Sequence, residues 1–235
     1  MKKVISIHQP NFIPWIPTLV KEACADMHVI LDHVEYSKNG WTNRCEFTSS
    51  SDKKAYLTIP VSKSDTSLTI DKVKIGNDSR YYSKLEKTFA SFGKSYPGNT
   101  LVRDIGLLIK NKQNETEKLV DINDEVSKCI REVLGITTKT QRSSIDTSLE
   151  KYQGADLVEK IFKNHEGKVY LTGTGGLKYL SSNFVINCKT ITPKILNLEP
   201  DEINTIDFIL KHGSNAKNRF SIIVDNFRKE IEGGM

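Results

Sequence analysis

The chain has 235 residues, of which 37% are hydrophobic and 27% charged, which is typical of a globular protein with a full core. No apolar run approaches the roughly 18 residues of a membrane-spanning helix. The formal net charge is +5, but the 34 basic and 29 acidic residues are interspersed, which argues against a nucleic-acid-binding face. The two N-terminal lysines precede an apolar stretch too short for a signal peptide, so we expect a cytoplasmic protein.

The first 32 residues predict a strand, a loop, a helix and a second strand. Residues 3–7 and 27–32 are short apolar strands, and residues 16–25 have helical spacing. This order within about 30 residues is the pattern of a parallel sheet. The expected apolar face of the helix consists of Ile16, Leu19, Val20 and Ala23.

Strands and helices alternate through the rest of the chain, without repeats or a low-complexity linker. Strands are expected at 43–47, 55–62, 68–75, 136–140 and 184–191, and a strand, glycine-rich turn and helix start at 168–180. Helices are expected at 79–92, over most of 100–134, and at 148–167, 203–213 and 220–231. We therefore predict one α/β domain over residues 1–235. Its mainly parallel, Rossmann-like sheet is flanked by helices, with a helical insertion around 80–135.

Three polar segments follow predicted strands, where ligands of open α/β sheets bind. The first is HQPNFIPW, residues 8–15, which places His8 at a strand end and Asn11 in a turn that the prolines restrict. His8 can act as a general acid or base, or bind phosphate as a cation. The alternative is a histidine that only shapes a rigid turn.

The second segment is DHVEYSKNGWTNR, residues 32–44. Lys38 and Arg44 suit an anionic group, and Trp41 offers a stacking face. The alternative is a polar surface hairpin in which Asp32 only bonds to a neighbouring turn.

The third segment is TGTGG, residues 172–176, before a predicted helix whose free N–H groups can bind an anion. It matches neither G-x-G-x-x-G nor the Walker A motif, and such turns also serve packing alone. His28, inside an apolar strand, is expected in the core. The four cysteines are far apart without a Cys-x-x-Cys pair, so we expect reduced thiols and assign no metal ligands.

These motifs resemble the WbqC-like protein family, found in bacterial O-antigen and other surface-polysaccharide gene clusters. The resemblance begins at Ile7 with IHQPNFIPW and continues through ADMHVILDHVEYSKNGWTNRCEF, residues 25–47. Weaker stretches such as YLTIPV, YLTGTGGLKYL and IDFILKHG extend it over nearly the whole chain. Two segments depart from the family pattern. Pro17 and Thr18 replace a frequent Gly-Tyr pair, and 189–200 lacks a His-Pro and aromatic segment, which leaves its substrate contacts open.

The resemblance implies a transferase that attaches a small acyl or aminoacyl group to an amino sugar or nucleotide-sugar precursor. His8 would then be the general base or a phosphate ligand. The implied partner is a small, phosphate-bearing substrate: a nucleotide sugar, a nucleotide or an acyl carrier. No cofactor can be named from the sequence. The candidate substrate-binding residues are Gln9, Asn11, Trp15, Asp32, Lys38, Trp41, Asn43, Arg44, Gly173, Gly175, Gly176 and Tyr179.

Two other functions stay open. The opening layout is similar to nucleotidyltransferases with an HxGH signature, although residues 14–17 stand where the second histidine would be expected. A nucleotidyl- or adenylyltransferase of the same pathway is therefore one alternative. The other is a non-catalytic module that binds a glycan intermediate.

Overall fold

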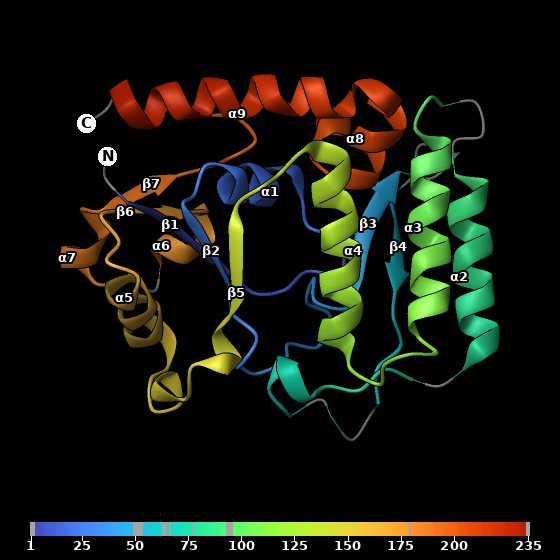
Figure 1. The fold of residues 1–235 in the computed structure, drawn as a ribbon, viewed down its shortest axis with the longest axis horizontal. Helices are drawn as coiled ribbons and strands as arrows, with labels where there is room; N and C mark the ends of the chain where they lie inside the picture. Colours follow the sequence, from blue (N-terminus) through green and yellow to red (C-terminus); the bar gives the residue numbers. More distant parts are fainter. Residues whose placement is uncertain are drawn as a thin grey trace.

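The computed structural model describes residues 3–48, 54–62, 65, 67–76, 78–92, 96–178 and 180–233. A five-stranded parallel sheet has the order β5-β2-β1-β6-β7 (Figure 1). The strands span Val4–His8 (β1), Met27–Ile30 (β2), Lys139–Arg142 (β5), Val169–Thr172 (β6) and Cys188–Thr190 (β7). Counted along the chain, the order is 3-2-1-4-5, as in a doubly wound Rossmann sheet. The predicted Rossmann-like α/β fold is confirmed.

Helices cover both faces of this sheet (Figure 1). The longer ones are Ile16–Ala23 (α1), Ser79–Ser91 (α2), Asn99–Lys112 (α3), Leu119–Leu134 (α4), Gly154–Asn164 (α5), Thr205–His212 (α8) and Ala216–Gly233 (α9). Two short ones are Thr174–Leu177 (α6) and Ser182–Val185 (α7). Among the described residues, no helix is both long enough and apolar enough to cross a bilayer.

The two faces of β1 carry different side chains, because successive residues of a strand point to opposite sides. Ile5 and Ile7 pack against α5, in a cluster that includes Leu157. Ser6 and His8 therefore point to the opposite side, where α1 and α4 lie. The alternation of β1 thus gathers its polar side chains beneath these two helices.

Between β2 and β5 the chain adds a hairpin and three helices. β3 (Arg44–Thr48) and β4 (Lys54–Thr58) pair antiparallel, and α2 packs along α3 beside them (Figure 1). Gly106 permits this packing, because a Cβ atom there would lie 2.5 Å from the Cβ of Phe89. The predicted helical insertion is present, and its last helix, α4, packs against α9.

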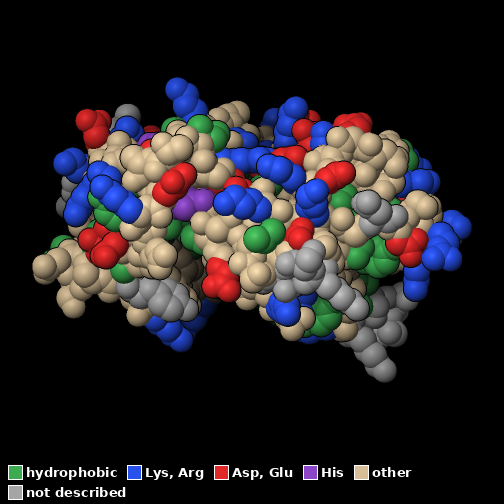
Figure 2. Space-filling view, turned by 90° about the horizontal axis from the view of Figure 1, so that it is seen from below, with side chains coloured by type: hydrophobic (Ala, Val, Ile, Leu, Met, Phe, Trp, Pro, Cys, Tyr) green, Lys and Arg blue, Asp and Glu red, His purple; other side chains and the backbone are tan. Residues whose placement is uncertain are grey.

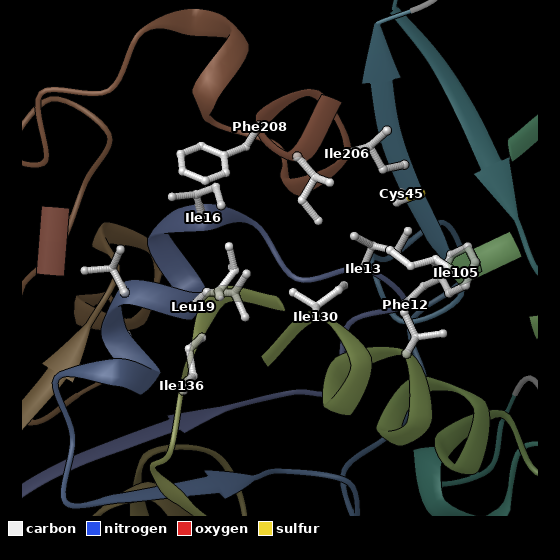
Figure 3. Packing of buried hydrophobic residues seen from close by; sticks show 14 of the residues in the cluster. Phe12, Ile13, Ile16, Leu19, Cys45, Ile105, Ile130, Ile136, Ile206 and Phe208 are labelled. Atoms are coloured by element: carbon white, nitrogen blue, oxygen red, sulfur yellow. The ribbon is translucent and has the colours of Figure 1, made fainter. Parts of the chain in front are cut away.

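The proline-rich loop after β1 is anchored in the core. Phe12 and Ile13 are 0% and 3% exposed and lie near Cys45 of β3 and Ile105 of α3 (Figure 3). The N–H of Phe12 also donates to the carbonyl of Trp41 at 2.9 Å. Apolar burial and this hydrogen bond hold the backbone that follows His8 in place.

The expected strand at 68–75 is wrong. A 3-10 turn, Ile70–Lys72 (η2), lies there, with an isolated bridge before it at Thr69 and two after it at Lys74 and Ile75. Its spacing of three residues per turn buries Ile70 and Val73 together, at 0% exposure each. Apolar residues three apart in this turn therefore produced the pattern that we interpreted as the alternation of a strand.

The expected strand at 184–191 is correct only in its second half. The first half belongs to α7, which begins where the Ser181 hydroxyl accepts the N–H of Phe184 as an N-cap. Phe184 packs between the rings of Phe162 and Tyr170. A helical turn can bury this aromatic side chain as well as a strand can, so the apolar pattern did not distinguish between the two.

Candidate functional site

A cavity of about 220 Å3 lies at the carboxyl end of β1 and β2, between α1 and α4. Such a position is where open α/β sheets bind their ligands. Three predicted site residues, His8, Gln9 and Asn11, line it. The two helices add further polar residues, among them Thr18 and Glu22 from α1, and Asn123, Asp124, Lys128 and Arg131 from α4.

His8 has one ring nitrogen available for a ligand. Its Nδ1 lies 2.8 Å from the carbonyl oxygen of Gln9, and a carbonyl only accepts hydrogen bonds, so Nδ1 carries the proton. The unprotonated Nε2 makes no hydrogen bond to any described residue. Its lone pair can therefore accept a hydrogen bond or a proton.

Burial keeps this imidazole neutral. Loss of hydration lowers the pKa of His8 to about 3, and the charge of Lys21 acts in the same direction, while the hydrogen bond with Gln9 opposes both. The ring is therefore uncharged at neutral pH. This argues against the predicted role of a cationic phosphate ligand and leaves Nε2 as an acceptor of a hydrogen bond or, as a weak base, of a proton.

Two charged residues of α1, Lys21 and Glu22, are buried beneath the loop, each 3% exposed. Lys21 donates from Nζ to the carbonyl of Ile7 at 3.2 Å. Burial lowers the pKa of Lys21 to about 7, with Glu22 opposing. Burial raises the pKa of Glu22 to about 7, with Arg131 and Lys21 opposing. Both groups titrate near neutrality, as groups that exchange protons in active sites do.

Arg131 of α4 connects this cluster to the edge of the sheet. Its Nε lies 2.8 Å from Oε1 of Glu22, close enough for an ion pair but not aligned as a hydrogen bond. Its terminal nitrogens donate to the carbonyl of Thr138 and, at 3.4 Å, to Oγ1 of Thr140. The ion pair joins the two helical walls of the cavity.

His28 of β2 lies in the core, 6% exposed, as the sequence predicted, and it also lines the cavity. Its Nδ1 is 2.6 Å from the Oγ of Ser6 on the adjacent strand. Burial holds the pKa of His28 well below its usual value. It therefore adds a second neutral imidazole beside His8.

The chain matches the model of the WbqC-like protein family over residues 9–197. This match includes the loop after β1, both helical walls of the cavity and the glycine-rich turn. The chain belongs to the WbqC-like protein family. No curated protein and no solved structure matches it significantly. The resemblance drawn from the motifs is thus confirmed at the level of the family.

In this WbqC-like protein, Asp32 lies outside the cavity and is fully buried. Its carboxylate accepts hydrogen bonds from the Ser143 hydroxyl at 3.1 Å, and from the Ser144 N–H and hydroxyl at 2.8 and 2.7 Å. These residues begin the 3-10 turn after β5, Ser143–Ile145 (η3). The geometry favours the alternative in which Asp32 fixes a neighbouring turn.

Asn43 and Lys38 are also outside the cavity. The side chain of Asn43 donates to the carbonyl of Ile59 at 2.8 Å, and the N–H of Ile59 donates back to the carbonyl of Asn43 at 2.7 Å. Asn43 thus fixes the start of the hairpin. Lys38 is exposed in a turn next to Asn39, whose φ is 62°.

Trp15, Trp41 and Arg44 form an aromatic stack with Tyr56. The Arg44 guanidinium carbon lies 5.0 Å from the ring centroid of Trp41 and 5.1 Å from that of Tyr56, and the rings of Trp15 and Trp41 are 5.0 Å apart. Arg44 has no acidic ion-pair partner among the described side chains. This stack keeps one cation available beside a partly exposed aromatic surface.

The glycine-rich turn lies at the same edge of the sheet but does not line the cavity. The pairing of Ser6 with Leu171 places Gly173 level with His8 on the adjacent strand. A Cβ atom on Gly173 or Gly175 would meet nothing within 4 Å, whereas one on Gly176 would lie 2.2 Å from the Oγ1 of Thr172. Packing therefore explains Gly176. Tyr179 lies outside the described residues.

Sequence reasoning missed the residues of α1 and α4 that line the cavity. For Asn123 a signal was present, because it stands in the apolar stripe of α4 with Leu119, Val126 and Ile130. A polar residue in such a stripe needs a partner when buried. Glu22, which lines the cavity, and the neighbouring Lys21 gave no comparable signal, because they fall beside the apolar face expected for α1.

Elsewhere on the surface, Lys and Arg are mixed with Asp and Glu over the face seen in Figure 2. The described residues include no group of three or more His, Cys, Asp or Glu suited to hold a metal ion. The four cysteines are free thiols.

Proposed function

We propose that this protein is a cytoplasmic transferase of surface-polysaccharide (O-antigen) biosynthesis. It would attach a small acyl or aminoacyl group to an amino sugar or a nucleotide-sugar precursor. The observation that carries this proposal is the fixed tautomer of His8, whose unprotonated Nε2 is available at the carboxyl end of β1. Family membership supports the pathway through the resemblance to surface-polysaccharide proteins.

In this reaction the acceptor amine attacks the acyl carbon of an activated donor. The new bond joins the amine nitrogen to that carbon, and the bond from the carbon to the carrier breaks. The nitrogen becomes positively charged as it bonds, and its N–H donates a hydrogen bond to His8 Nε2, along which the proton moves as the bond to the carrier breaks. The proton then passes to the departing carrier, and His8 returns to its neutral form.

The carrier of the acyl group would be anionic and bind at the aromatic stack. Arg44 and Lys38 would hold its phosphate, and Trp15 and Trp41 would contact its apolar part. The loop after β1 connects the cavity with the aromatic stack, because Asn11 lines the cavity while the N–H of Phe12 donates to the carbonyl of Trp41.

A thermal-shift screen with coenzyme A thioesters, nucleotide sugars, free amino acids, ATP and CTP tests the proposal. A ligand at about 100 times its Kd raises the free energy of unfolding by roughly 2.7 kcal/mol. Product formation is then measured with the ligands that bind. We expect His8→Ala to lower kcat about 10²–10⁴-fold, the usual contribution of a general base. The matched control is His165→Ala, on the turn after α5 and outside the cavity. Unchanged turnover in His8→Ala contradicts the proposal.

The strand order favours a second candidate, a nucleotidyl- or adenylyltransferase. In a 3-2-1-4-5 sheet the point where the order reverses, here between β1 and β6, is a common nucleotide site. His8 and the glycine-rich turn flank that point. Stabilisation by ATP or CTP alone, with pyrophosphate release, would favour this candidate. If no ligand binds, a non-catalytic module for a glycan intermediate becomes the better description.

A further inference from the structure

Asn123 has an unused hydrogen-bond acceptor in the wall of the cavity. Its side chain is 1% exposed and lines the cavity. The amide nitrogen donates to the carbonyl of Thr42 at 2.8 Å, which fixes the orientation of the amide group because a carbonyl cannot donate. Oδ1 is left buried without any hydrogen bond to the described residues. Buried acceptors normally have a partner, so this oxygen points to a missing donor.

Other hydrogen-bond acceptors line the cavity beside Asn123. His8 Nε2 is unprotonated and unpaired among the described side chains, and the Glu22 carboxylate also lines the cavity. The lining also carries more carboxylates than cations, because Glu22, Asp124 and Glu125 face only Lys128 and Arg131, and Arg131 is already paired with Glu22. This wall therefore matches a ligand that donates hydrogen bonds better than one rich in phosphate oxygens.

We propose that Asn123 determines specificity by accepting a hydrogen bond from the amine or hydroxyl of the acceptor substrate, a small polyhydroxylated or amino-bearing molecule. The inference rests on the proposed function, because it names the substrate group that His8 would deprotonate. It places the nucleophile in this cavity and the anionic carrier outside it. A site built to pair with an N–H or O–H discriminates strongly against analogues that lack the donor.

Binding of three probes, D-glucosamine, 2-deoxy-D-glucose and inorganic phosphate, tests the inference by isothermal titration calorimetry. The two sugars differ only in the presence of the amino group at carbon 2. Asn123→Leu removes both Oδ1 and the bond to Thr42, whereas Asn123→Asp removes the bond but keeps an acceptor. Both variants are first checked for native circular dichroism and a cooperative thermal transition.

We expect the wild type to bind glucosamine at least tenfold more tightly than 2-deoxyglucose. Asn123→Leu should lose this preference and Asn123→Asp should keep it. Equal loss in both variants would assign Asn123 a structural role and overturn the inference. So would a preference that survives in Asn123→Leu, tighter binding of phosphate than of glucosamine, or no binding of glucosamine.

This experiment measures binding without turnover, so it separates the two proposals. An Asn123-dependent preference without any acyl transfer would support the recognition and refute the transferase. Acyl transfer by a protein whose preference for glucosamine survives in Asn123→Leu would support the transferase and refute the role of Asn123 in recognition.

Discussion

At the scale of single residues, burial decides the chemistry of the cavity. Nothing in the sequence distinguishes His8, Lys21 and Glu22 from other titratable residues. In the folded protein the pKa of each is shifted in the direction that favours its uncharged form. Lys21 and Glu22 are buried and His8 is partly so, and the loss of hydration is the largest cause of each pKa shift. Their reactivity is therefore a property of position.

The first prediction concerns His8 and acid. Because burial lowers its pKa from 6.5 to about 3, the unfolded chain binds a proton between these values that the folded protein does not. The stability contribution of neutral His8 is complete above pH 6.5 and is lost as the pH falls toward 3. Urea unfolding of wild type and His8→Asn from pH 7 to 4 should show a shallower decline for the variant. Parallel curves would contradict the burial of a neutral imidazole.

The second prediction concerns the buried ion pair. At a pH well above 7, where Glu22 is ionised, Arg131→Met leaves the Glu22 carboxylate buried without its partner, which should cost about 3–5 kcal/mol. Adding Glu22→Gln removes the unpaired charge and should restore most of that loss. A double-mutant cycle by chemical denaturation measures the coupling. Additive effects of the two changes would show that the ion pair contributes nothing to stability.

At the scale of elements, the helices bring together what the sequence separates. α1 follows β1 directly, but α4 lies more than 100 residues further along, after the hairpin and two other helices. Both helices cover the same end of the sheet. They lie on the face toward which the alternation of β1 and β2 directs Ser6, His8 and His28. The glycine-rich turn joins β6 to α6 at the same edge.

The third prediction separates packing from ligand binding in the glycine-rich turn. Gly176→Ala should destabilise the protein by about 1–3 kcal/mol, because the new Cβ collides with Thr172 on β6. Gly175→Ala is the matched control, since its Cβ would meet nothing within 4 Å. It should change the free energy of unfolding by less than about 1 kcal/mol. Equal destabilisation by both would mean that the turn has another conformation.

At the scale of the whole molecule, one core joins the sheet to the inserted elements. Apolar residues of α1, α2, α3, α4, α8 and α9 and of the hairpin belong to a single cluster. Asp207 of α8 adds polar contacts, because it accepts the N–H and hydroxyl of Thr48 at the end of β3. These shared contacts support our proposal that residues 1–235 act as one domain.

The fourth prediction follows from this shared core. Unfolding in urea should be a single transition with the same midpoint by far-ultraviolet circular dichroism and by fluorescence of Trp15 and Trp41. Circular dichroism reports the helices, and the two tryptophans report the junction of the loop and the hairpin. Different midpoints would show that the inserted elements unfold separately and would contradict the single domain.

The sequence by itself determined the parallel sheet, most of its helices and the position of His8. Periodicity and turn residues are local, so a strand, a rigid loop and an amphipathic helix can be recognised without knowing their neighbours. The same reasoning failed at residues 68–75, where an i, i+3 pair buried by a 3-10 turn imitated the alternation of a strand. It also grouped Asp32, Asn43 and Arg44 with His8 because they share a short stretch of sequence.

Tertiary structure alone decided which of these residues meet. Asp32 and Asn43 bond to turns near them in the fold, while Glu22, Asn123 and Arg131, from two helices, line the same cavity as His8. Whether α4 lies beside His8 depends on how the inserted hairpin and helices fold back over the sheet. No local sequence pattern encodes that arrangement. Burial is likewise a property of the packed chain. The lowered pKa of His8 and the unused acceptor of Asn123 both arise from the packing of α1 and α4 over the carboxyl end of β1.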